Sequence, residues 1–368
     1  MKIKIKKDEI LKKLNRIQYI VEKKSSMAVL SYFLLKAKKE ESFIMATDLE
    51  TAIKIPIDLE IIEEGEYCLP GKKLYEISKE IDNEISIESS DTGWVTIKSG
   101  KTNFRLGSIN VSAFPIFPSL DFEKKLTISG QDLLDSIAKT IYATGEADTK
   151  YVLNTLLFHI KVKDNTLTVV GTDGHRLSLN IKNVKLDGIE EDLRLIISKK
   201  SISEVRRNVS ADESINIWIE KNYILLKTRE AELLCRLVEG NYPNYEFVIP
   251  VSNEAILTTN KFDLEKSLKK AIIISSEKYS TVIFDIESTM MVVSASNPEI
   301  GEVRDEVIVN FNKAPFRIAF SARILLEVLS AMDSEKIIIQ MNDSQSSVIL
   351  LSEKEEDTYK CVLMPIRL

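Results

Sequence analysis

The sequence predicts an α+β protein that consists of three copies of one domain. Short marks recur in the same order at a period of about 125 residues. Strands with alternating β-branched residues outnumber the segments with helical periodicity, and each such segment follows a strand. This order favours two helices packed on antiparallel sheet in each copy. The predicted domains are residues 1–121 (N-terminal), 122–251 (central) and 252–368 (C-terminal).

Four sets of marks define the repeat, and it is their shared order and offset that make it specific. The period far exceeds the roughly 20–50 residues of solenoid repeats, so each copy is expected to have its own core. Two sets are helix segments, aligned at Glu9, Asp132 and Asp263 and again at Glu76, Glu204 and Glu327. The other two are the pairs Phe114-Pro115, Tyr242-Pro243 and Met364-Pro365, and the pairs Thr47-Asp48 and Thr172-Asp173.

Each half of the first copy is predicted to contain a strand, a helix and further strands. The first helix is predicted from Ile10, Leu14, Ile17 and Val21, which fall on one helical face. The strands are predicted from alternation between turn-forming breaks. The first half is predicted as a strand at 2–6, a helix at 9–21 and strands at 28–37, 42–46 and 52–59. The second half is predicted as a strand at 66–69, a helix at 72–81 and strands at 85–89, 94–99 and 102–106.

The composition excludes several classes of protein. The chain has 368 residues, and its hydrophobic fraction of 44% excludes an intrinsically disordered chain. Its start, Met1–Lys7, alternates like a strand without the apolar core of a signal peptide, and no apolar run is long enough to span a membrane. The cysteines Cys68, Cys235 and Cys361 are scattered and odd in number, which indicates reduced core residues in a cytoplasmic protein.

The distribution of charge bears on the partner. A net charge of −6 argues at first against nucleic acid, because nucleic-acid-binding domains are usually basic. The six predicted helix segments together carry +9, however, which leaves −15 for the rest of the chain; the count covers residues 6–24, 72–81, 131–142, 199–208, 261–270 and 321–332. Two explanations stay open. Lys and Arg favour helices and can simply solvate an exposed face, or the helices line a surface that faces phosphates.

An enzyme is an alternative class, and the sequence offers little chemistry for one. His159 falls in an alternating strand and His175 follows Asp173-Gly174, a favourable hairpin turn, so both have structural explanations. No Ser-His-Asp motif, metal-spaced cluster or glycine-rich phosphate loop is found. We therefore expect no catalytic residue, metal or cofactor. A third class, an adaptor that binds only proteins, gives no reason for net positive helices.

Five motifs lie in order along the whole chain: Ala46–Glu50 (ATDLE), Tyr151–Asn154 (YVLN), Thr172–Leu177 (TDGHRL), Glu239–Tyr245 (EGNYPNY) and the terminal Met364–Leu368 (MPIRL). With the total length and the threefold repeat, these motifs resemble those of the bacterial DNA sliding clamp, the beta subunit of DNA polymerase III. The resemblance implies the DNA-clamp fold, with helices lining the inside and antiparallel sheets outside. It also implies a ring that is closed by a head-to-tail dimer.

The resemblance further implies a function without catalysis. Double-stranded DNA would thread the ring without sequence readout, and the clamp would slide on it, held by diffuse lysine charge. By tethering the replicative polymerase, it would raise the effective concentration of the enzyme and so its processivity. The implied partners are DNA, a second copy of the chain, the replicative polymerase, the clamp loader, and other DNA polymerases and repair proteins.

The resemblance assigns residues to three surfaces, although ordinary surface lysines and helix-core isoleucines remain alternatives. Phe247, Ile324 and Val152 depart from the family's frequent Arg, Tyr and aromatic residue, which leaves the detailed specificity of a pocket open. The DNA-facing residues are Lys24, Lys72, Lys101, Tyr151, Lys199, Lys200 and Arg236. A hydrophobic pocket for short linear motifs, between the central and C-terminal domains, comprises Leu153, Thr172, Gly174, His175, Arg176, Leu177, Pro243, Phe247, Val248, Ile324, Ser347, Val362, Met364, Pro365, Ile366 and Arg367. The dimer interface comprises Phe104 and Leu106 opposite Ile273 and Ile274, with Lys73 facing Glu299, Glu302, Asp305 and Glu306.

Overall fold

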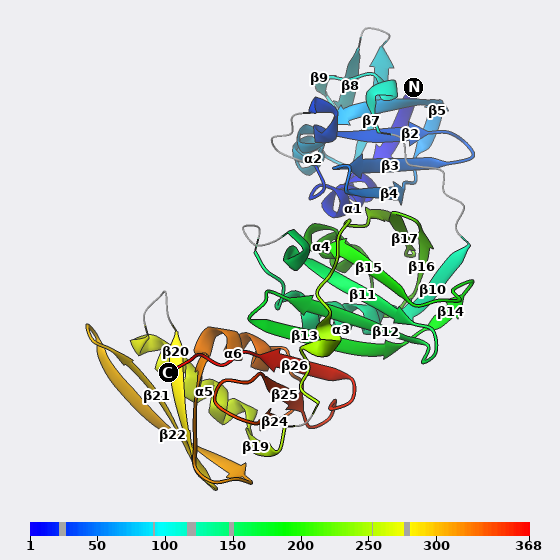
Figure 1. Cartoon of the computed structure of the whole chain (residues 1–368). Helices are drawn as coiled ribbons and strands as arrows, with labels where there is room; N and C mark the ends of the chain where they lie inside the picture. Colours follow the sequence, from blue (N-terminus) through cyan, green and yellow to red (C-terminus); the bar gives the residue numbers. More distant parts are fainter. Residues whose placement is uncertain (22–26, 91–92, 116–122, 147–150, 252, 276–279) are drawn as a thin grey trace. The chain divides into compact units, whose positions relative to one another are not determined.

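A computed structural model shows a chain of helices and antiparallel strands that forms two compact units, each described here by itself (Figure 1). Six α-helices and 26 strands lie in the part of the chain that the structure describes. Unit 1 consists of residues 1–132, 185–190 and 200–238, and unit 2 of residues 133–184, 191–199 and 239–368. The structure describes residues 1–21, 27–90, 93–115, 123–146, 151–251, 253–275 and 280–368.

Unit 1 contains two antiparallel sheets. The strand order of the five-stranded sheet is β5 (Glu60–Glu63), β1 (Lys2–Lys6), β7 (Glu84–Ser90), β8 (Trp94–Ser99) and β9 (Thr102–Gly107). The order of the nine-stranded sheet is β14 (Lys185–Asp187), β10 (Lys124–Ser129), β16 (Ser214–Glu220), β17 (Tyr223–Lys227), β18 (Glu232–Arg236), β4 (Thr51–Pro56), β3 (Ser42–Thr47), β2 (Tyr32–Ala37) and β6 (Gly65–Pro70). The larger sheet therefore joins strands of the N-terminal and central copies.

Two helices, α1 (Lys7–Ile17) and α2 (Gly71–Glu80), pack together in the N-terminal copy. Ile10, Leu14 and Ile17 are buried on one face of α1, as their helical spacing predicts. The apolar stripe explains why this segment is a helix, because burying it against the sheet stabilises the fold.

In the first copy the helix predicted at 9–21 and the strands predicted at 28–37 and 52–59 have other bounds, the last ending at Pro56, and one strand was not predicted. The helix predicted at 9–21 begins at Lys7 and ends at Ile17, since apolar spacing that continues into the following turn does not mark a helix end. The strand predicted at 28–37 begins only at Tyr32, after a 3₁₀ turn, η1 (Ala28–Ser31), in which the adjacent Val29 and Leu30 are both buried. Strand β5 was not predicted because its sequence, Glu-Ile-Ile-Glu, does not alternate.

Unit 2 contains a twelve-stranded sheet that runs through the central and C-terminal copies. Its first six strands are β15 (Leu193–Ser198), β11 (Thr155–Lys161), β12 (Thr166–Thr172), β13 (Arg176–Asn183), β26 (Tyr359–Leu363) and β25 (Val348–Ser352). The order continues with β24 (Lys336–Met341), β19 (Ala255–Asn260), β22 (Gly301–Phe311), β21 (Met290–Asn297), β20 (Thr281–Ile286) and β23 (Phe316–Ser321).

The C-terminal copy has its own core between this sheet and two helices, α5 (Lys261–Ile274) and α6 (Ala322–Ser330). Asn260 caps α5 through its side chain, which accepts hydrogen bonds from the backbone N–H groups of Phe262 and Asp263. Leu264 and Leu268 of α5 and Leu325 of α6 are completely buried in the core.

The threefold repeat is visible in the order of elements. In each copy one strand (β1, β10 or β19) leads directly into a first helix, and another (β6, β15 or β23) into a second. The central copy's helices are α3 (Gly130–Ile141) and α4 (Lys199–Asn208). All three cysteines are buried and unoxidised, as predicted.

Candidate functional site

Two joints between strands connect neighbouring copies, and they are built alike. In the first joint β4 pairs with β18, and Thr51 lies opposite Cys235. In the second joint β13 pairs with β26, and Arg176 lies opposite Leu363. A matching backbone hydrogen bond extends each joint, from the N–H of Arg236 to the carbonyl of Glu50 (2.8 Å) and from the N–H of Met364 to the carbonyl of His175 (3.0 Å).

The same turn precedes both joints. The Thr47 hydroxyl accepts the N–H of Leu49 at 3.0 Å, and the Thr172 hydroxyl accepts the N–H of Gly174 at 3.2 Å. The following aspartate in each turn accepts two further backbone N–H groups. Leu49 and Gly174 both have positive φ, 74° and 90°. The Thr-Asp marks of the sequence therefore identify a turn that leads into the strand of each joint, β4 in the first and β13 in the second.

The second joint brings together many of the residues predicted for the peptide pocket. Leu177 lies opposite Val362, and the Thr172 hydroxyl donates to the carbonyl of Arg176 at 2.6 Å. The N–H of Ile366 donates to the carbonyl of Ala319 at 2.8 Å, which holds the terminal segment beside β23. The turn 172–177 and the segment 362–366 are therefore neighbours, fixed by backbone hydrogen bonds.

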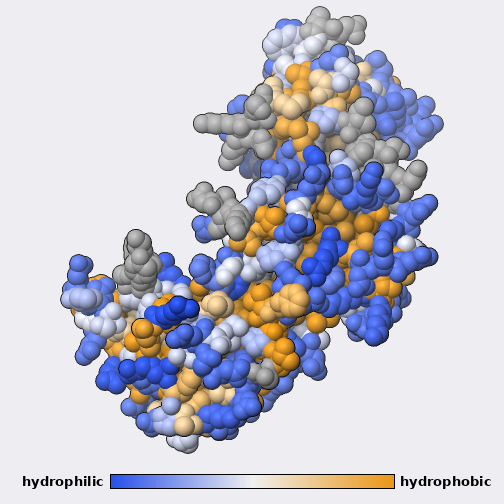
Figure 2. Space-filling view, viewed as in Figure 1, coloured by the Kyte–Doolittle hydropathy of each residue, from blue (hydrophilic) through white to orange (hydrophobic). Residues whose placement is uncertain are grey.

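Other predicted pocket residues lie on separate elements of unit 2. Leu153 lies in a 3₁₀ turn, η3 (Tyr151–Asn154), Ile324 packs on the C-terminal core, and Ser347 immediately precedes β25. The buried Tyr242 donates from its hydroxyl to the carbonyl of Val170 at 3.1 Å, which anchors the segment carrying Pro243, Phe247 and Val248. The side chain of Phe247 is 88% exposed and that of Met364 is 47% exposed. Figure 2 also shows hydrophobic residues on the surface of unit 2.

Arg176 links the turn to both copies at the second joint. Its guanidinium donates to Asp173 Oδ2 (3.0 Å), to Glu327 Oε2 on α6 (2.5 Å) and to the carbonyl of Tyr142 (2.7 Å). The side chain is only 10% exposed, so these charge-assisted bonds are largely shielded from water. Arg176 therefore has a structural role: its side chain connects the turn with both copies at the second joint.

Replacing Arg176 by alanine should lower the free energy of unfolding by about 2–4 kcal/mol, because it removes the guanidinium donor from Asp173 Oδ2 and from the Tyr142 carbonyl. Urea unfolding followed by circular dichroism measures the change. The matched control is Arg323→Ala, at an exposed position on α6, which should shift stability by less than about 0.5 kcal/mol. Equal effects of the two substitutions would contradict this structural role of Arg176.

A buried lysine strengthens the second joint, and sequence reasoning did not find it. Lys139 is 3% exposed and forms ion pairs with Asp135 (3.1 Å), Asp333 (3.4 Å) and Glu355. Burial lowers the pKa of Lys139, but its hydrogen bonds with Glu355 and Asp135 outweigh that effect and raise it. Asp135 lies four residues earlier on the same helix, a spacing that the sequence shows. Asp333 and Glu355 belong to the C-terminal copy, and no local pattern connects them with Lys139.

The first joint holds one residue that was predicted to face DNA. Lys200 of α4 forms an ion pair with the buried Asp48 at 2.5 Å, and the hydroxyls of Thr51 and Ser201 share a hydrogen bond of 2.7 Å. On the same helix, burial raises the pKa of the Glu204 carboxyl, although the positive charge of Arg207 acts to lower it. Lys200 is thus tied to the N-terminal copy.

The other predicted DNA-facing residues are mostly exposed and lie on different elements. Lys24 lies outside the described residues. Lys199 is half-buried at the start of α4. The exposed positions are Lys72 on α2, Lys101 between β8 and β9, Tyr151 in η3 and Arg236 at the end of β18.

The residues predicted for the dimer interface lie on two strands, in the turn before one of them and on two helices. Lys73 is exposed in the first turn of α2. Phe104 and Leu106 are half-buried on β9, whose only strand partner among the described residues is β8. Ile273 is 74% exposed at the end of α5, so the alternative reading of Ile273 as helix core is wrong, whereas Ile274 is half-buried. The predicted acidic stretch begins in the β21–β22 turn, where Glu299 lies, and continues along β22 with Glu302 and Glu306. Asp305 of this stretch pairs with Lys270 of the same chain at 2.7 Å.

His159 is buried on β11, where its Nδ1 lies 2.8 Å from the hydroxyl of Tyr245. Burial, together with the nearby Arg194 and Lys161, lowers the pKa of His159. As the pH falls below about 6.5, the unfolded chain takes up the proton first. The contribution of His159 to the free energy of unfolding is therefore highest above about pH 6.5, where the imidazole is neutral in both states. It falls as the pH drops from about 6.5 towards the lower pKa of His159 in the folded protein.

A His159→Asn variant should accordingly lose less stability than the wild type between pH 7.5 and pH 5.5, a difference that urea unfolding at both pH values measures. The exposed His175 provides the control. A His175→Asn variant should keep the wild-type pH dependence. An identical pH dependence in His159→Asn and the wild type would show that burial of this imidazole has no such effect.

Three copies of one α+β domain, joined edge to edge through shared sheets, define the class of clamp proteins. Family models of the DNA polymerase III beta subunit match the chain in three consecutive parts: the N-terminal domain at residues 1–118, the central domain at 127–244 and the C-terminal domain at 246–367. The chain belongs to this family, the sliding clamps of DNA polymerase III.

Individual relatives agree with the family. The beta sliding clamp of Pseudomonas putida is 29% identical over 371 residues, with 100% of each chain covered. The structure of the DNA polymerase III subunit beta from Pseudomonas aeruginosa is similar with a TM-score of 0.94 at 28% identity, and that of the C. crescentus beta sliding clamp with a TM-score of 0.94 at 29%, each covering 100% of this chain. The predicted fold class is confirmed.

Two further findings concern the described residues only. None of their helices is both long enough and apolar enough to cross a membrane. Their His, Cys, Asp and Glu side chains form no group of three or more that could hold a metal ion.

Proposed function

We propose that two copies of this chain close head to tail into a ring of six domains, bounded in each chain as 1–121, 122–251 and 252–368. The main support is a pair of strand edges, β9 and the first part of β22, each of which has a strand partner on one side only among the described residues. In the repeat, β4 and β13 correspond to the first part of β22, and β18 and β26 correspond to β9. The two internal joints pair β4 with β18 and β13 with β26. The remaining edges, β9 and the first part of β22, would pair between two chains and form a third joint.

The helix ends support the same joint. Tyr19, Tyr142 and Ile273 lie at the same distance after the aligned residues Glu9, Asp132 and Asp263. Arg207 of the central copy stacks on the Tyr19 ring at 4.4 Å in the first joint. Tyr142 forms hydrogen bonds with Tyr359 and Cys361 of the C-terminal copy in the second. The exposed Ile273 is the equivalent position in the C-terminal copy.

Equivalence also orients the charges of the proposed joint. Lys200 meets the turn residue Asp48 in the first joint, and α2 contributes Lys72 and Lys73 at the matching place. The matching turn, between β21 and β22, contains Glu299, with Glu302 beginning β22. Lys73 aligns with Ser201, whose hydroxyl bonds that of Thr51 across the first joint. We therefore place a Lys73–glutamate contact between the two chains, together with apolar contacts from Phe104, Leu106, Ile273 and Ile274.

The ring would encircle double-stranded DNA without reading its sequence and slide along it. The net +9 of the predicted helix segments against −15 elsewhere supports helices on the DNA side. The proposed DNA-facing residues are Lys24, Lys72, Lys101, Tyr151, Lys199, Lys200 and Arg236. Ring closure would then keep the protein on DNA through topology, with no tight contact to any one phosphate.

The proposed role is to tether the replicative polymerase, and the clamp itself supplies no catalytic group. The surface at the second joint suits short linear motifs of the polymerase, the clamp loader and repair proteins, because Met364 and Phe247 present apolar area above a fixed backbone. Effective concentration then raises processivity.

Retention on circular DNA tests the proposed function directly. Once loaded by a clamp loader, the protein should stay on a closed circle through gel filtration, because a ring cannot leave a circle without opening. Cutting the circle with a restriction enzyme should release it within the time of the column run. Equal loss from circular and linear DNA would overturn topological binding.

A further inference from the structure

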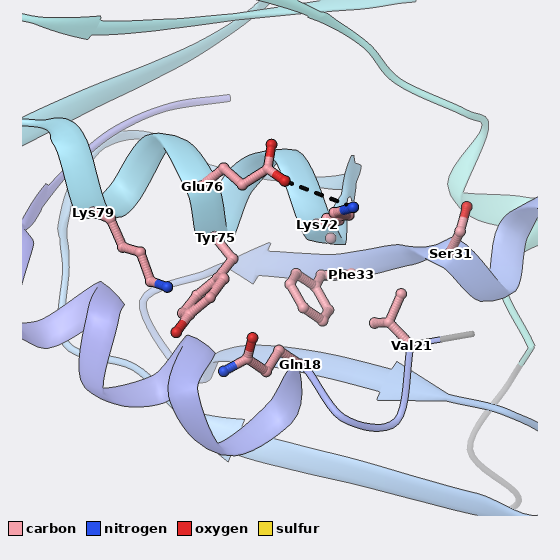
Figure 3. A pocket seen from close by; sticks show the side chains of 9 residues that line it. Gln18, Val21, Ser31, Phe33, Lys72, Tyr75, Glu76 and Lys79 are labelled. Atoms are coloured by element: carbon pink, nitrogen blue, oxygen red, sulfur yellow. Dashed lines mark ion pairs between the residues drawn. The ribbon is translucent and has the colours of Figure 1, made fainter. Parts of the chain in front are cut away.

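A cavity of about 430 Å³ opens between α1 and α2 of the N-terminal copy (Figure 3). Its wall includes the residue after α1, the beginning of β2 and one side of α2. The volume falls in the lower part of the range of roughly 300–1,000 Å³ that is typical of small-ligand sites. Neither the strand joints nor the predicted peptide pocket uses this cavity.

Two aromatic rings form its interior. Figure 3 shows Tyr75 and Phe33 next to each other at the cavity. A Cβ atom at Gly71 would lie 3.0–3.2 Å from three atoms of the Phe33 ring, so glycine at the first position of α2 is what leaves room for this ring. The Tyr75 hydroxyl donates to Asn15 Oδ1 at 2.8 Å, and Lys79 Nζ lies 4.1 Å from the Tyr75 ring centroid. These contacts hold the Tyr75 ring in position.

The polar side chains around the rings favour a ligand that is planar at one end and anionic at the other. Gln18 lies across the cavity from α2 and offers both a donor and an acceptor. Lys72 lines the cavity at the beginning of α2, at 3.9 Å from Glu76. The Glu76 carboxylate is also paired with Lys73 at 2.7 Å, so the lining keeps a net positive charge.

We propose that this cavity binds one unpaired nucleotide, with its base on the Tyr75 ring, its base edge at Gln18 and its phosphate at Lys72. Aromatic stacking with nearby lysines is the usual basis of binding to single-stranded DNA. The proposal rests on the proposed function for the source of the nucleotide, since a strand held at the helices would present unpaired bases at a gap or end. A free nucleotide has the same chemistry.

Photocrosslinking locates the site on the full-length protein. A ten-nucleotide thymidine oligonucleotide with one 5-iododeoxyuridine is irradiated with the protein, and mass spectrometry identifies the crosslinked peptide. We expect the crosslink on Tyr75, and competition by unlabelled oligonucleotide. Crosslinks that occur only outside this cavity would overturn the proposal. Competition by thymidine monophosphate at similar concentration assigns the site to a free nucleotide, and competition by the oligonucleotide alone assigns it to a strand.

Substitutions separate stacking from general charge in fluorescence-anisotropy titrations with the same oligonucleotide. Tyr75→Leu should weaken binding about 5- to 150-fold, whereas Tyr75→Phe should stay within about twofold. Lys72→Gln should lower the slope of log affinity against log salt by about 0.7. Lys98→Gln, an exposed lysine of the same copy that is paired with Glu88 and lies outside the cavity lining, is the control and should leave affinity within about twofold.

The two proposals fail in different ways. Unchanged affinity in both Tyr75→Leu and Lys72→Gln would overturn the nucleotide site even if the protein is retained on circular DNA. Loss from circular DNA would overturn ring closure even if Tyr75 crosslinks. Circular dichroism of each variant shows that loss of binding does not come from unfolding.

Discussion

Replacing Ile273 by aspartate should convert the proposed dimer into monomers. Ile273 is 74% exposed in the single chain, and its equivalents Tyr19 and Tyr142 both lie in internal joints. A carboxylate there would lose apolar contact and be desolvated without a partner, costing about 2–4 kcal/mol per joint. A closed dimer has two identical joints, so the effect doubles. Sedimentation velocity at micromolar concentration measures the change.

Phe262→Asp is the matched control for this prediction. Phe262 is 69% exposed near the opposite end of the same helix, α5. The control variant should remain dimeric, and it should be retained on circular DNA like the wild type, while Ile273→Asp is not. The milder double variant Ile273→Ala, Ile274→Ala should also dissociate. A persistent dimer in Ile273→Asp would show that the third joint lies elsewhere.

Deleting Met364–Leu368 should abolish binding of a polymerase-derived linear-motif peptide without affecting the dimer. The deletion removes the exposed Met364 and the backbone bonds from Met364 to His175 and from Ile366 to Ala319, so one side of the proposed pocket is lost. Loss of a central apolar anchor in such a pocket weakens binding by roughly 30-fold or more. Isothermal titration calorimetry with the peptide measures the loss.

A graded truncation controls for the shortened chain. Removing only Leu368, which is 69% exposed, should keep peptide affinity within about threefold of the wild type. Sedimentation velocity should show that both truncated proteins are still dimers, because the deletions remove none of the residues of the proposed joint. Unchanged peptide affinity in the longer deletion would refute the pocket at the second joint.

Local patterns predicted the secondary structure well in segments where the hydrophobic periodicity and the position in the repeat indicate the same element. The burial of Ile10, Leu14 and Ile17 on α1 follows directly from their spacing. Boundaries failed where apolar residues continue past an element, as at Val29 and Leu30 in η1. Periodicity reports which face of an element is buried, but it contains no information about the residue at which hydrogen bonding changes type.

Long-range partners were the part that local patterns could not supply. Strand β4 pairs with β18, far along the chain, and alternation defines only the faces of each strand, not its neighbour at the edge. The ion pairs of Lys139 with Asp333 and Glu355 and that of Lys200 with Asp48 depend on this pairing. The turn 172–177 and the terminal 362–366 were placed near each other only through the family resemblance.

The way in which the joints are made has a consequence for divergence among relatives. Main-chain N–H and C=O groups supply the hydrogen bonds between β4 and β18 and between β13 and β26, and every residue except proline carries both groups. Substitution of side chains along these strands therefore leaves the bonds in place. Mutational drift can proceed far at the borders between copies before the architecture changes. The Pseudomonas aeruginosa protein keeps this architecture, with a TM-score of 0.94, at 28% identity.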